Sequence, residues 1–215
     1  MQTAAIIVGI DHYATKPLTS AVNDALAFRD ALIAHQIVDP QGIVLLTTDQ
    51  PPDLQPTRDN IVDKLHEFFE HGDSLQRLIF FFAGHGILTF TDAARGRTRT
   101  VLIPTDLKDL SAQGNRLIDL NEVLDFMRRA GPQEQIFIID ACRDLAWDKH
   151  PSVGLLGWTA RDSGTGERAQ ATLYAVSEKG QALGQQNGMG VMSTHLIDGL
   201  KGNGIAKVFD DATHG

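Results

Sequence analysis

The apolar residues of this chain fall into short, nearly continuous runs, separated by longer stretches with apolar residues at helical spacing. A run of four to seven residues is too short for a buried helix and is typical of a strand covered on both faces of a parallel sheet. We therefore expect strands at residues 4–10, 43–46, 78–83, 136–139 and 172–176. A polar segment at 91–100, followed by a short apolar run at 101–104, predicts a hairpin or flap with its arginines in solvent.

Capping residues precede the stretches with helical spacing and mark where four helices should begin. The expected caps are Thr19 or Ser20 for a helix to about residue 35, Thr57 for one to residue 71, Asp119 with Glu122 for one ended by Gly131 and Pro132, and Ser193 for one to about residue 201. Strands that alternate with helices favour an α/β fold with a mainly parallel central sheet and right-handed crossovers.

Two of the expected strands end in side chains that can carry out chemistry. His85 stands between two glycines after the run at 78–83, and Cys142, the single cysteine, follows the run at 136–139. Ligands bind at the carboxyl ends of parallel strands, so a thiol and an imidazole at two such ends make a candidate nucleophile and base. The competing interpretations are a cysteine that only packs in the core and a histidine with a structural role.

The segments Gly-His-Gly around His85 and Asp-Ala-Cys-Arg around Cys142 resemble the His and Cys motifs of caspase-like cysteine peptidases. Asp140 stands where caspases have Gln, which is similar to the metacaspase and paracaspase branch. The resemblance implies a three-layer caspase-like α/β fold, with a mainly parallel sheet flanked by helices. It also implies a Cys142–His85 dyad without a side-chain orienter, and an oxyanion hole made by the backbone N–H groups of Gly86 and Cys142.

A pocket for a basic residue is a further implication of the resemblance. Asp24 matches an acidic position that metacaspase-like proteins have near the start of their first helix, and Asp140 precedes the nucleophile by two residues. Two carboxylates would favour Arg or Lys and repel Asp. Glu178 is a third candidate for this pocket. The alternative for Asp24 is a first-turn acid that only complements the helix dipole.

Composition and charge restrict the kinds of binding partner and cofactor that we expect. A formal net charge of −8 argues against a nucleic-acid surface, and a single cysteine excludes an internal disulfide. Neither a signal peptide nor a membrane span is evident, so we expect a cytoplasmic protein without membrane contact. No zinc spacing or nucleotide-binding motif accompanies the candidate site, so no metal or cofactor is expected to be required. The family resemblance leaves calcium as a candidate activator.

We expect one peptidase domain over residues 1–215, with a large-subunit-like part to about 145, a connecting loop at about 143–170 and a small-subunit-like part from 171 to 215. It could be a module of a longer protein with a regulatory domain or activator. The loop is polar and offers Lys149, Arg161 and Arg168 as sites of self-processing, of which the latter two are favoured. A packed, uncut loop is the alternative, because Trp147, Leu155, Leu156 and Trp158 could anchor it.

These observations predict a cysteine endopeptidase that acts on protein or peptide substrates after Arg or Lys. Two other classes stay open at this point. One is a catalytically silent caspase-fold scaffold used for assembly, and the other is a Cys-His hydrolase that acts on a different amide or a thioester.

Overall fold

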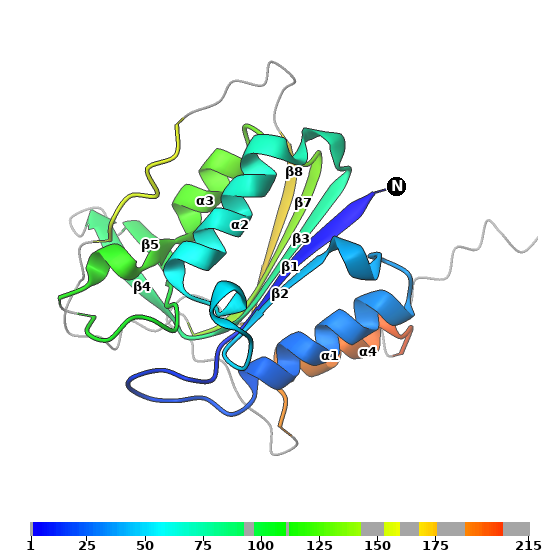
Figure 1. Cartoon of the computed structure of the whole chain (residues 1–215), viewed down its shortest axis with the longest axis horizontal. Helices are drawn as coiled ribbons and strands as arrows, with labels where there is room; N and C mark the ends of the chain where they lie inside the picture. The colour runs from blue at the N-terminus through cyan, green and yellow to red at the C-terminus, as the bar shows by residue number, and fades with distance from the viewer. Residues whose placement is uncertain are drawn as a thin grey trace, which may run out of the picture.

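The computed structural model describes residues 2–92, 97–110, 112–142, 153–159, 168–175 and 188–203. Its centre is a five-stranded sheet in the order β2-β1-β3-β7-β8, and all four neighbouring pairs are parallel (Figure 1). The strands are β1 (Thr3–Gly9), β2 (Ile43–Thr47), β3 (Arg77–Gly84), β7 (Glu134–Ala141) and β8 (Ala169–Tyr174). All five expected strands are therefore present, and the α/β class is confirmed.

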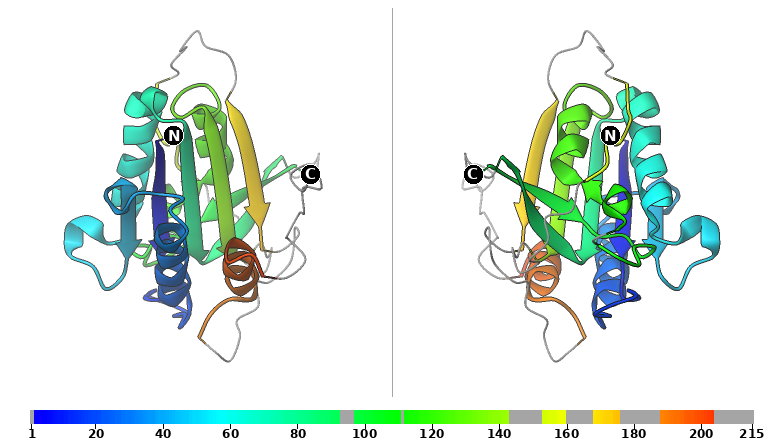
Figure 2. Two further views of the ribbon diagram at one scale, coloured as in Figure 1. Left: turned by 90° about the vertical axis from the view of Figure 1, so that its right-hand side faces the viewer. Right: turned by 90° about the vertical axis from the view of Figure 1, so that its left-hand side faces the viewer.

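Helices cover both faces of this sheet, which gives the three layers expected (Figure 2). The helices are α1 (Ala21–Ala34), α2 (Arg58–His71), α3 (Leu120–Met127) and α4 (Val191–Leu200), with short 3-10 turns at Pro40–Gly42, Pro52–Leu54, Gly72–Ser74 and Gly114–Arg116. One core forms between the sheet and α2 and α3, and includes Phe80, Phe82 and Phe137. A second core lies on the α1 and α4 side, where Phe28 stacks on Phe81 at 4.5 Å between ring centroids.

A small antiparallel sheet adjoins the end of β3. It comprises β4 (Gly86–Asp92), β5 (Arg97–Leu102) and β6 (Ile118–Asp119), in that order. A hairpin is present in this region as expected, but its strands differ from the expected ones: it pairs residues 86–92 with 97–102 rather than 91–100 with 101–104. Arg99 is solvated as expected, with 43% of its side chain exposed, and it also pairs with the buried Asp119 at 2.6 Å.

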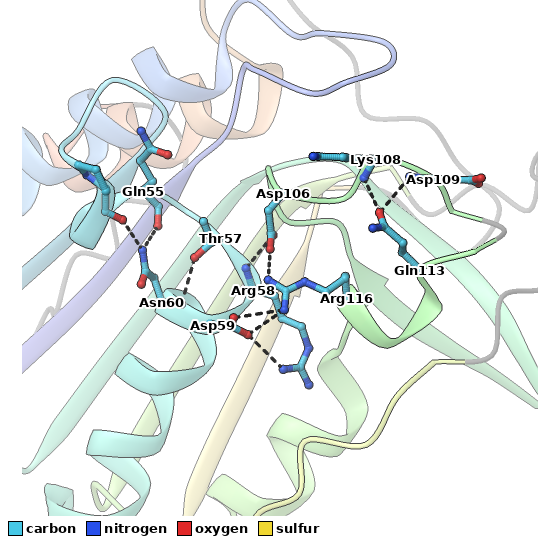
Figure 3. Close-up of polar contacts among 11 residues, drawn as sticks. Gln55, Thr57, Arg58, Asp59, Asn60, Asp106, Lys108, Asp109, Gln113 and Arg116 are labelled. Atoms are coloured by element: carbon cyan, nitrogen blue, oxygen red, sulfur yellow. Dashed lines mark hydrogen bonds and ion pairs between the residues drawn. The ribbon is translucent and has the colours of Figure 1, made fainter.

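Two of the expected helix caps are confirmed. The Thr57 hydroxyl accepts a hydrogen bond from Asn60 N–H at the start of α2, and Asp119 accepts from two N–H groups at the start of α3. The start of α2 is also fixed from a distant loop, because Asp106 accepts from the Arg58 N–H and pairs with Arg116 (Figure 3).

Of the other two expected caps, Ser20 does stand at the N-cap position of α1, whereas the assignment of Ser193 is wrong. Ser20 precedes α1 but makes no capping bond; the carboxylate of Asp11 accepts from Ala21 N–H at 2.9 Å instead. Ser193 lies inside the first turn of α4, whose N-cap is Gly190. Its hydroxyl is directed to a partner in the sheet, because it donates to Asp140 Oδ2 at 2.7 Å.

The described part of the connecting loop is packed. Leu156 N–H donates to Glu122 at 3.0 Å, and Trp158 stacks on Phe69 at 5.2 Å between ring centroids, so these two residues do anchor the segment. Leu155 is 76% exposed and does not. Trp147 lies outside the described residues, as do Lys149 and Arg161.

Arg168 ends this loop, and β8 begins at the next residue. Its side chain is buried, with the residue 4% exposed, and donates to the Gly131 carbonyl at 3.0 Å and to Asp73 at 2.8 Å. Its backbone N–H donates to Arg128. A peptidase cannot reach a residue held in this way, so the structure argues against Arg168 as a cleavage site in the folded chain.

Candidate active site

The two candidate catalytic residues lie at adjacent strand ends. β3 and β7 are parallel neighbours, and their register pairs Gly84 with Ala141, so His85 and Cys142 are the next residues on each chain segment. The backbones stay close beyond the sheet, because a methyl group added at Gly86 would lie 2.8 Å from the Cys142 carbonyl oxygen. His85 and Cys142 line one cavity of about 240 Å³ together with Asp24 and Asp140.

His85 is held by the loop that follows β1. Its Nε2 lies 2.6 Å from the carbonyl oxygen of Lys16, and its backbone N–H donates to the Tyr13 hydroxyl at 2.8 Å. A carbonyl oxygen can only accept, so Nε2 must carry the proton and donate it. Nδ1 is then the nitrogen left to take a proton from elsewhere.

Burial lowers the pKa of His85 below its ordinary value, and the Lys16 carbonyl opposes this shift only partly. The ring is therefore neutral at neutral pH, as a proton acceptor must be. Lys16 itself has a φ of 56°, in the left-handed region that costs a non-glycine residue about 1 kcal/mol or more. Lys16 thus adopts a left-handed conformation at the position whose carbonyl oxygen contacts the His85 ring.

Cys142 is half-buried and follows directly after β7. Its short side chain reaches the cavity because β7 ends beside the cavity. The backbone of Gly86 runs alongside, in the first pair of the small sheet with Leu102. The two backbone N–H groups expected to form an oxyanion hole thus belong to adjacent segments at this strand edge.

Two carboxylates occupy the other part of the cavity. Asp24 comes from α1 and is 3% exposed, and Asp140 comes from the end of β7 and is 8% exposed. Gly190, the N-cap of α4, touches both: its N–H donates to Asp24 Oδ1 at 2.8 Å, and a methyl group added to it would lie 2.8 Å from Asp140 Oδ2 and 3.2 Å from Asp24 Oδ2. A larger residue there would have to displace these carboxylate oxygens, so glycine lets the start of α4 lie directly against the pair.

The described residues provide no cation for either carboxylate: neither Asp24 nor Asp140 forms an ion pair with a Lys, Arg or His side chain in that part of the chain. Burial, reinforced by the neighbouring Asp140 and Asp11, raises the pKa of Asp24 to about 7, although the Gly190 N–H lowers it in part. Burial also raises the pKa of Asp140, against the two hydrogen bonds from Ser193. The site is therefore short of positive charge.

Of the six predicted site residues, the structure brings four to one cavity, namely Asp24, His85, Asp140 and Cys142. Gly86 lies beside the Cys142 backbone without lining the cavity, and Glu178 lies outside the described residues. Sequence reasoning missed Tyr13, Lys16, Gly190 and Ser193. Tyr13 sits in the Asp-His-Tyr segment just after the first apolar run, a polar break at a strand end that could have drawn attention to it. Lys16 acts through its backbone carbonyl, which every type of residue has, so the sequence gives no sign of this role.

The described ranges contain neither a cluster of metal-binding side chains nor a membrane-spanning helix. There, no group of three or more His, Cys, Asp and Glu side chains is arranged to hold a metal ion. Over the same ranges, every helix is too short or too polar to cross a bilayer.

Comparison with known proteins places the chain among peptidases. Residues 2–213 match the caspase domain of the peptidase C14 group. A probable protease from a Desulfuromonadales bacterium is 27% identical to this chain over an alignment of 228 positions. The alignment covers 98% of this chain and 27% of that protein. Metacaspase-1 of Pyricularia oryzae is 34% identical over 84 residues, or 38% of this chain and 21% of that protein. Metacaspase-1 of Plasmodium falciparum is 32% identical over 89 residues, or 40% and 14%.

The alignments therefore span between 14% and 27% of the length of these curated relatives. The similarity to the probable protease extends over nearly the whole chain, whereas the similarity to the two metacaspases covers well under half of it.

Proposed function

The chain belongs to the caspase-domain family, a family of cysteine-type endopeptidases, and we propose that it cleaves peptide bonds after Arg and Lys with Cys142 and His85 as its catalytic pair. The observation that carries this proposal is the single cavity lined by Cys142, His85 and two buried carboxylates. The thiol and imidazole supply the chemistry, and the carboxylates supply the preference for a cation.

In the first half of the reaction, the Cys142 sulfur attacks the carbonyl carbon of the scissile bond. The thiol proton passes to Nδ1 of His85, because Nε2 already donates to the Lys16 carbonyl. The negative charge that develops on the substrate oxygen would be met by the backbone N–H groups of Gly86 and Cys142, whose backbone segments are neighbours at the sheet edge. His85 then returns its proton to the departing amine, and the C–N bond breaks.

The acyl-enzyme that remains is a thioester between Cys142 and the new carboxyl end of the substrate. Water attacks this carbonyl while His85 takes one of its protons. The C–S bond breaks, the acid is released, and the proton returns to the sulfur. No cofactor takes part in this sequence of steps.

Specificity for a basic residue follows from the imbalance of charge in the cavity. Two carboxylates with raised pKa values, close together and without an ion-pair partner in the described part of the chain, gain most from a cationic ligand. A guanidinium can bridge both with its planar set of donors, which favours Arg over Lys. An Asp side chain would add a third negative charge and be rejected.

A peptide panel tests this function. The panel holds the sequence constant and places Arg, Lys, citrulline or Asp before the scissile bond; citrulline has the shape of Arg without its charge. We expect Arg to be cut fastest, then Lys, with citrulline and Asp slower by roughly 100-fold or more. Cys142→Ala and His85→Ala serve as inactive controls. Equal rates for Arg and citrulline would refute the proposed pocket, and full activity of Cys142→Ala would refute the nucleophile.

Two further properties belong to the same proposal. Calcium dependence is tested by repeating the panel with added calcium and with a chelator. Self-processing is tested by the intact mass of wild type and of Cys142→Ala after incubation. Because Arg168 is buried, we expect fragments that end at Arg161, and only in the wild type. An unchanged chain under conditions where peptides are hydrolysed would contradict self-processing.

A further inference from the structure

Tyr13 replaces a backbone hydrogen bond at the point where the small sheet meets His85. β4 and β5 pair Gly86 with Leu102, so His85 and Ile103 are the next pair in register. A hydrogen-bonded pair in an antiparallel ladder exchanges two N–H···O bonds. One is present, because Ile103 N–H donates to the His85 carbonyl at 3.0 Å. In place of the other, His85 N–H donates to Tyr13 Oη at 2.8 Å, and this hydroxyl donates to the Ile103 carbonyl at 3.2 Å.

The tyrosine hydroxyl is therefore inserted into the ladder as one extra oxygen between donor and acceptor. The two backbones stay apart at this pair, and the regular hairpin stops at Gly86 instead of taking in His85. Burial raises the pKa of Tyr13 further above its ordinary value, so the hydroxyl keeps the proton that it donates.

Gly84 provides the space that this arrangement needs. A methyl group added there would lie 2.5 Å from Tyr13 Oη, closer than two such atoms approach. The first glycine of the Gly-His-Gly segment is thus explained by the hydroxyl beside it. The Tyr13 ring also lies against the His85 ring, with 4.5 Å between centroids and planes tilted by 48°.

The loop after β1 therefore contacts both the backbone and the ring of the histidine. The Tyr13 hydroxyl accepts from the His85 backbone N–H, and the backbone carbonyl of Lys16, three residues further on, accepts a hydrogen bond from the ring Nε2. The loop is itself tied to the hairpin side, because the Thr105 hydroxyl donates to the His12 carbonyl at 2.6 Å.

We propose that Tyr13 is a positioning residue for His85: its hydroxyl, wedged between the His85 N–H and the Ile103 carbonyl, keeps the hairpin from closing at His85 and so sets the imidazole beside Cys142. The inference rests on the proposed function for its kinetic readout and extends it to a residue that does not line the cavity.

The first test is Tyr13→Phe. Without the hydroxyl, the His85 N–H and the Ile103 carbonyl can bond directly, and the imidazole moves with the backbone. We expect kcat on the Arg peptide to fall roughly 10–100-fold, with KM within a few-fold of wild type, because Asp24 and Asp140 are untouched. The matched control is Tyr174→Phe, the same change at the only other tyrosine, whose ring lies against the α2 and α3 core. A wild-type kcat in Tyr13→Phe overturns the proposal.

A double-mutant cycle sharpens this test. Gly84→Ala should also lower kcat, because its methyl group displaces the Tyr13 hydroxyl. In the Tyr13→Phe background that hydroxyl is gone, so the same glycine change should cost markedly less than it does in wild type. Equal losses in both backgrounds would show that the two positions are not coupled through the hydroxyl, and would overturn the proposal.

Alkylation of Cys142 by iodoacetamide gives a readout that needs no peptide substrate, since the chain has one cysteine. Its rate against pH reports how well His85 promotes the thiolate. We expect the Tyr13→Phe profile to move from that of wild type toward that of His85→Ala, whereas Tyr174→Phe should match wild type. A Tyr13→Phe profile equal to wild type overturns the proposal. Absence of peptide cleavage by wild type would defeat the proposed function, and the alkylation profiles would still decide the role of Tyr13.

Discussion

The protein buries carboxylates in two regions, and the two differ in whether a positively charged side chain pairs with the carboxylate. Asp119, at the start of α3, is 1% exposed, accepts from the N–H groups of Asn121 and Glu122 and pairs with Arg99 at 2.6 Å. Asp24 and Asp140, beside the candidate dyad, are buried almost as deeply. They receive hydrogen bonds from Gly190 and Ser193 but no cation from the described residues.

The difference separates a carboxylate that stabilises the fold from the pair that we propose binds the cation of the substrate. A buried charge is tolerated when donors and an opposite charge compensate it, as at Asp119. At Asp24 and Asp140 the compensation is incomplete, which is why burial raises both pKa values. The folded protein carries a cost there that a cationic substrate side chain would remove.

The strongest test of this contrast is to remove charge from the pocket. Asp24→Asn and Asp140→Asn should each lower kcat/KM for the Arg peptide by roughly 100-fold or more, because a buried guanidinium loses its partner. Cleavage of the citrulline peptide should change far less, so the preference for Arg over citrulline should collapse. If both variants kept the wild-type preference, the pocket would have to be elsewhere.

Removal of the compensated carboxylate should have the reverse outcome. Asp119→Ala deletes a helix cap, so we expect the free energy of unfolding to fall by about 1–2 kcal/mol in denaturant titration. The kcat/KM of the folded fraction should stay at the wild-type value. Asp119→Asn is the matched control, because it retains the cap and loses only the half-exposed pair with Arg99, worth at most about 1 kcal/mol. A change in Arg preference in either variant would erase the contrast between the two regions.

The smallest expected effect is in the pH dependence of stability. The pKa of Asp24 is raised to about 7 in the folded protein. The neutral carboxyl therefore contributes stability that is complete below the ordinary Asp pKa and is lost as the pH rises through 7. Asp24→Asn is always neutral and should gain relative to wild type between pH 5 and pH 8.5. At about 2–4 °C per kcal/mol for a chain of this size, the gain should appear as a few degrees in Tm. A difference in Tm that does not vary with pH would contradict it.

The sequence was enough to predict the central sheet and the candidate site, because both depend on continuous apolar runs and on the residues at their ends. The antiparallel strand from Gly86 was missed, since in this segment apolar and polar residues are mixed and give no continuous run. β8 begins three residues earlier than expected, because Ala169 and Gln170 lie on the sheet edge and carry no apolar signal.

The errors near the site have a common physical cause: long-range partners replaced local ones. A serine before a helical pattern predicts a cap, but Ser193 binds Asp140 across 53 positions of sequence. Asp11 caps α1 in place of the nearer Ser20. The Lys16 carbonyl faces His85 from a distance of 69 positions, and no side-chain pattern encodes a backbone acceptor.

The burial of Arg168 has a consequence for the cleavage of one molecule of this protein by another. Arg168 is a residue of the type that the proposed pocket accepts, yet in the folded chain its guanidinium is enclosed by Asp73 and Gly131. A molecule in which β8 has come away from β7 would present an uncovered arginine in an extended segment. Under the proposed specificity, intact molecules would then cleave such partly unfolded copies after Arg168 and leave folded copies uncut.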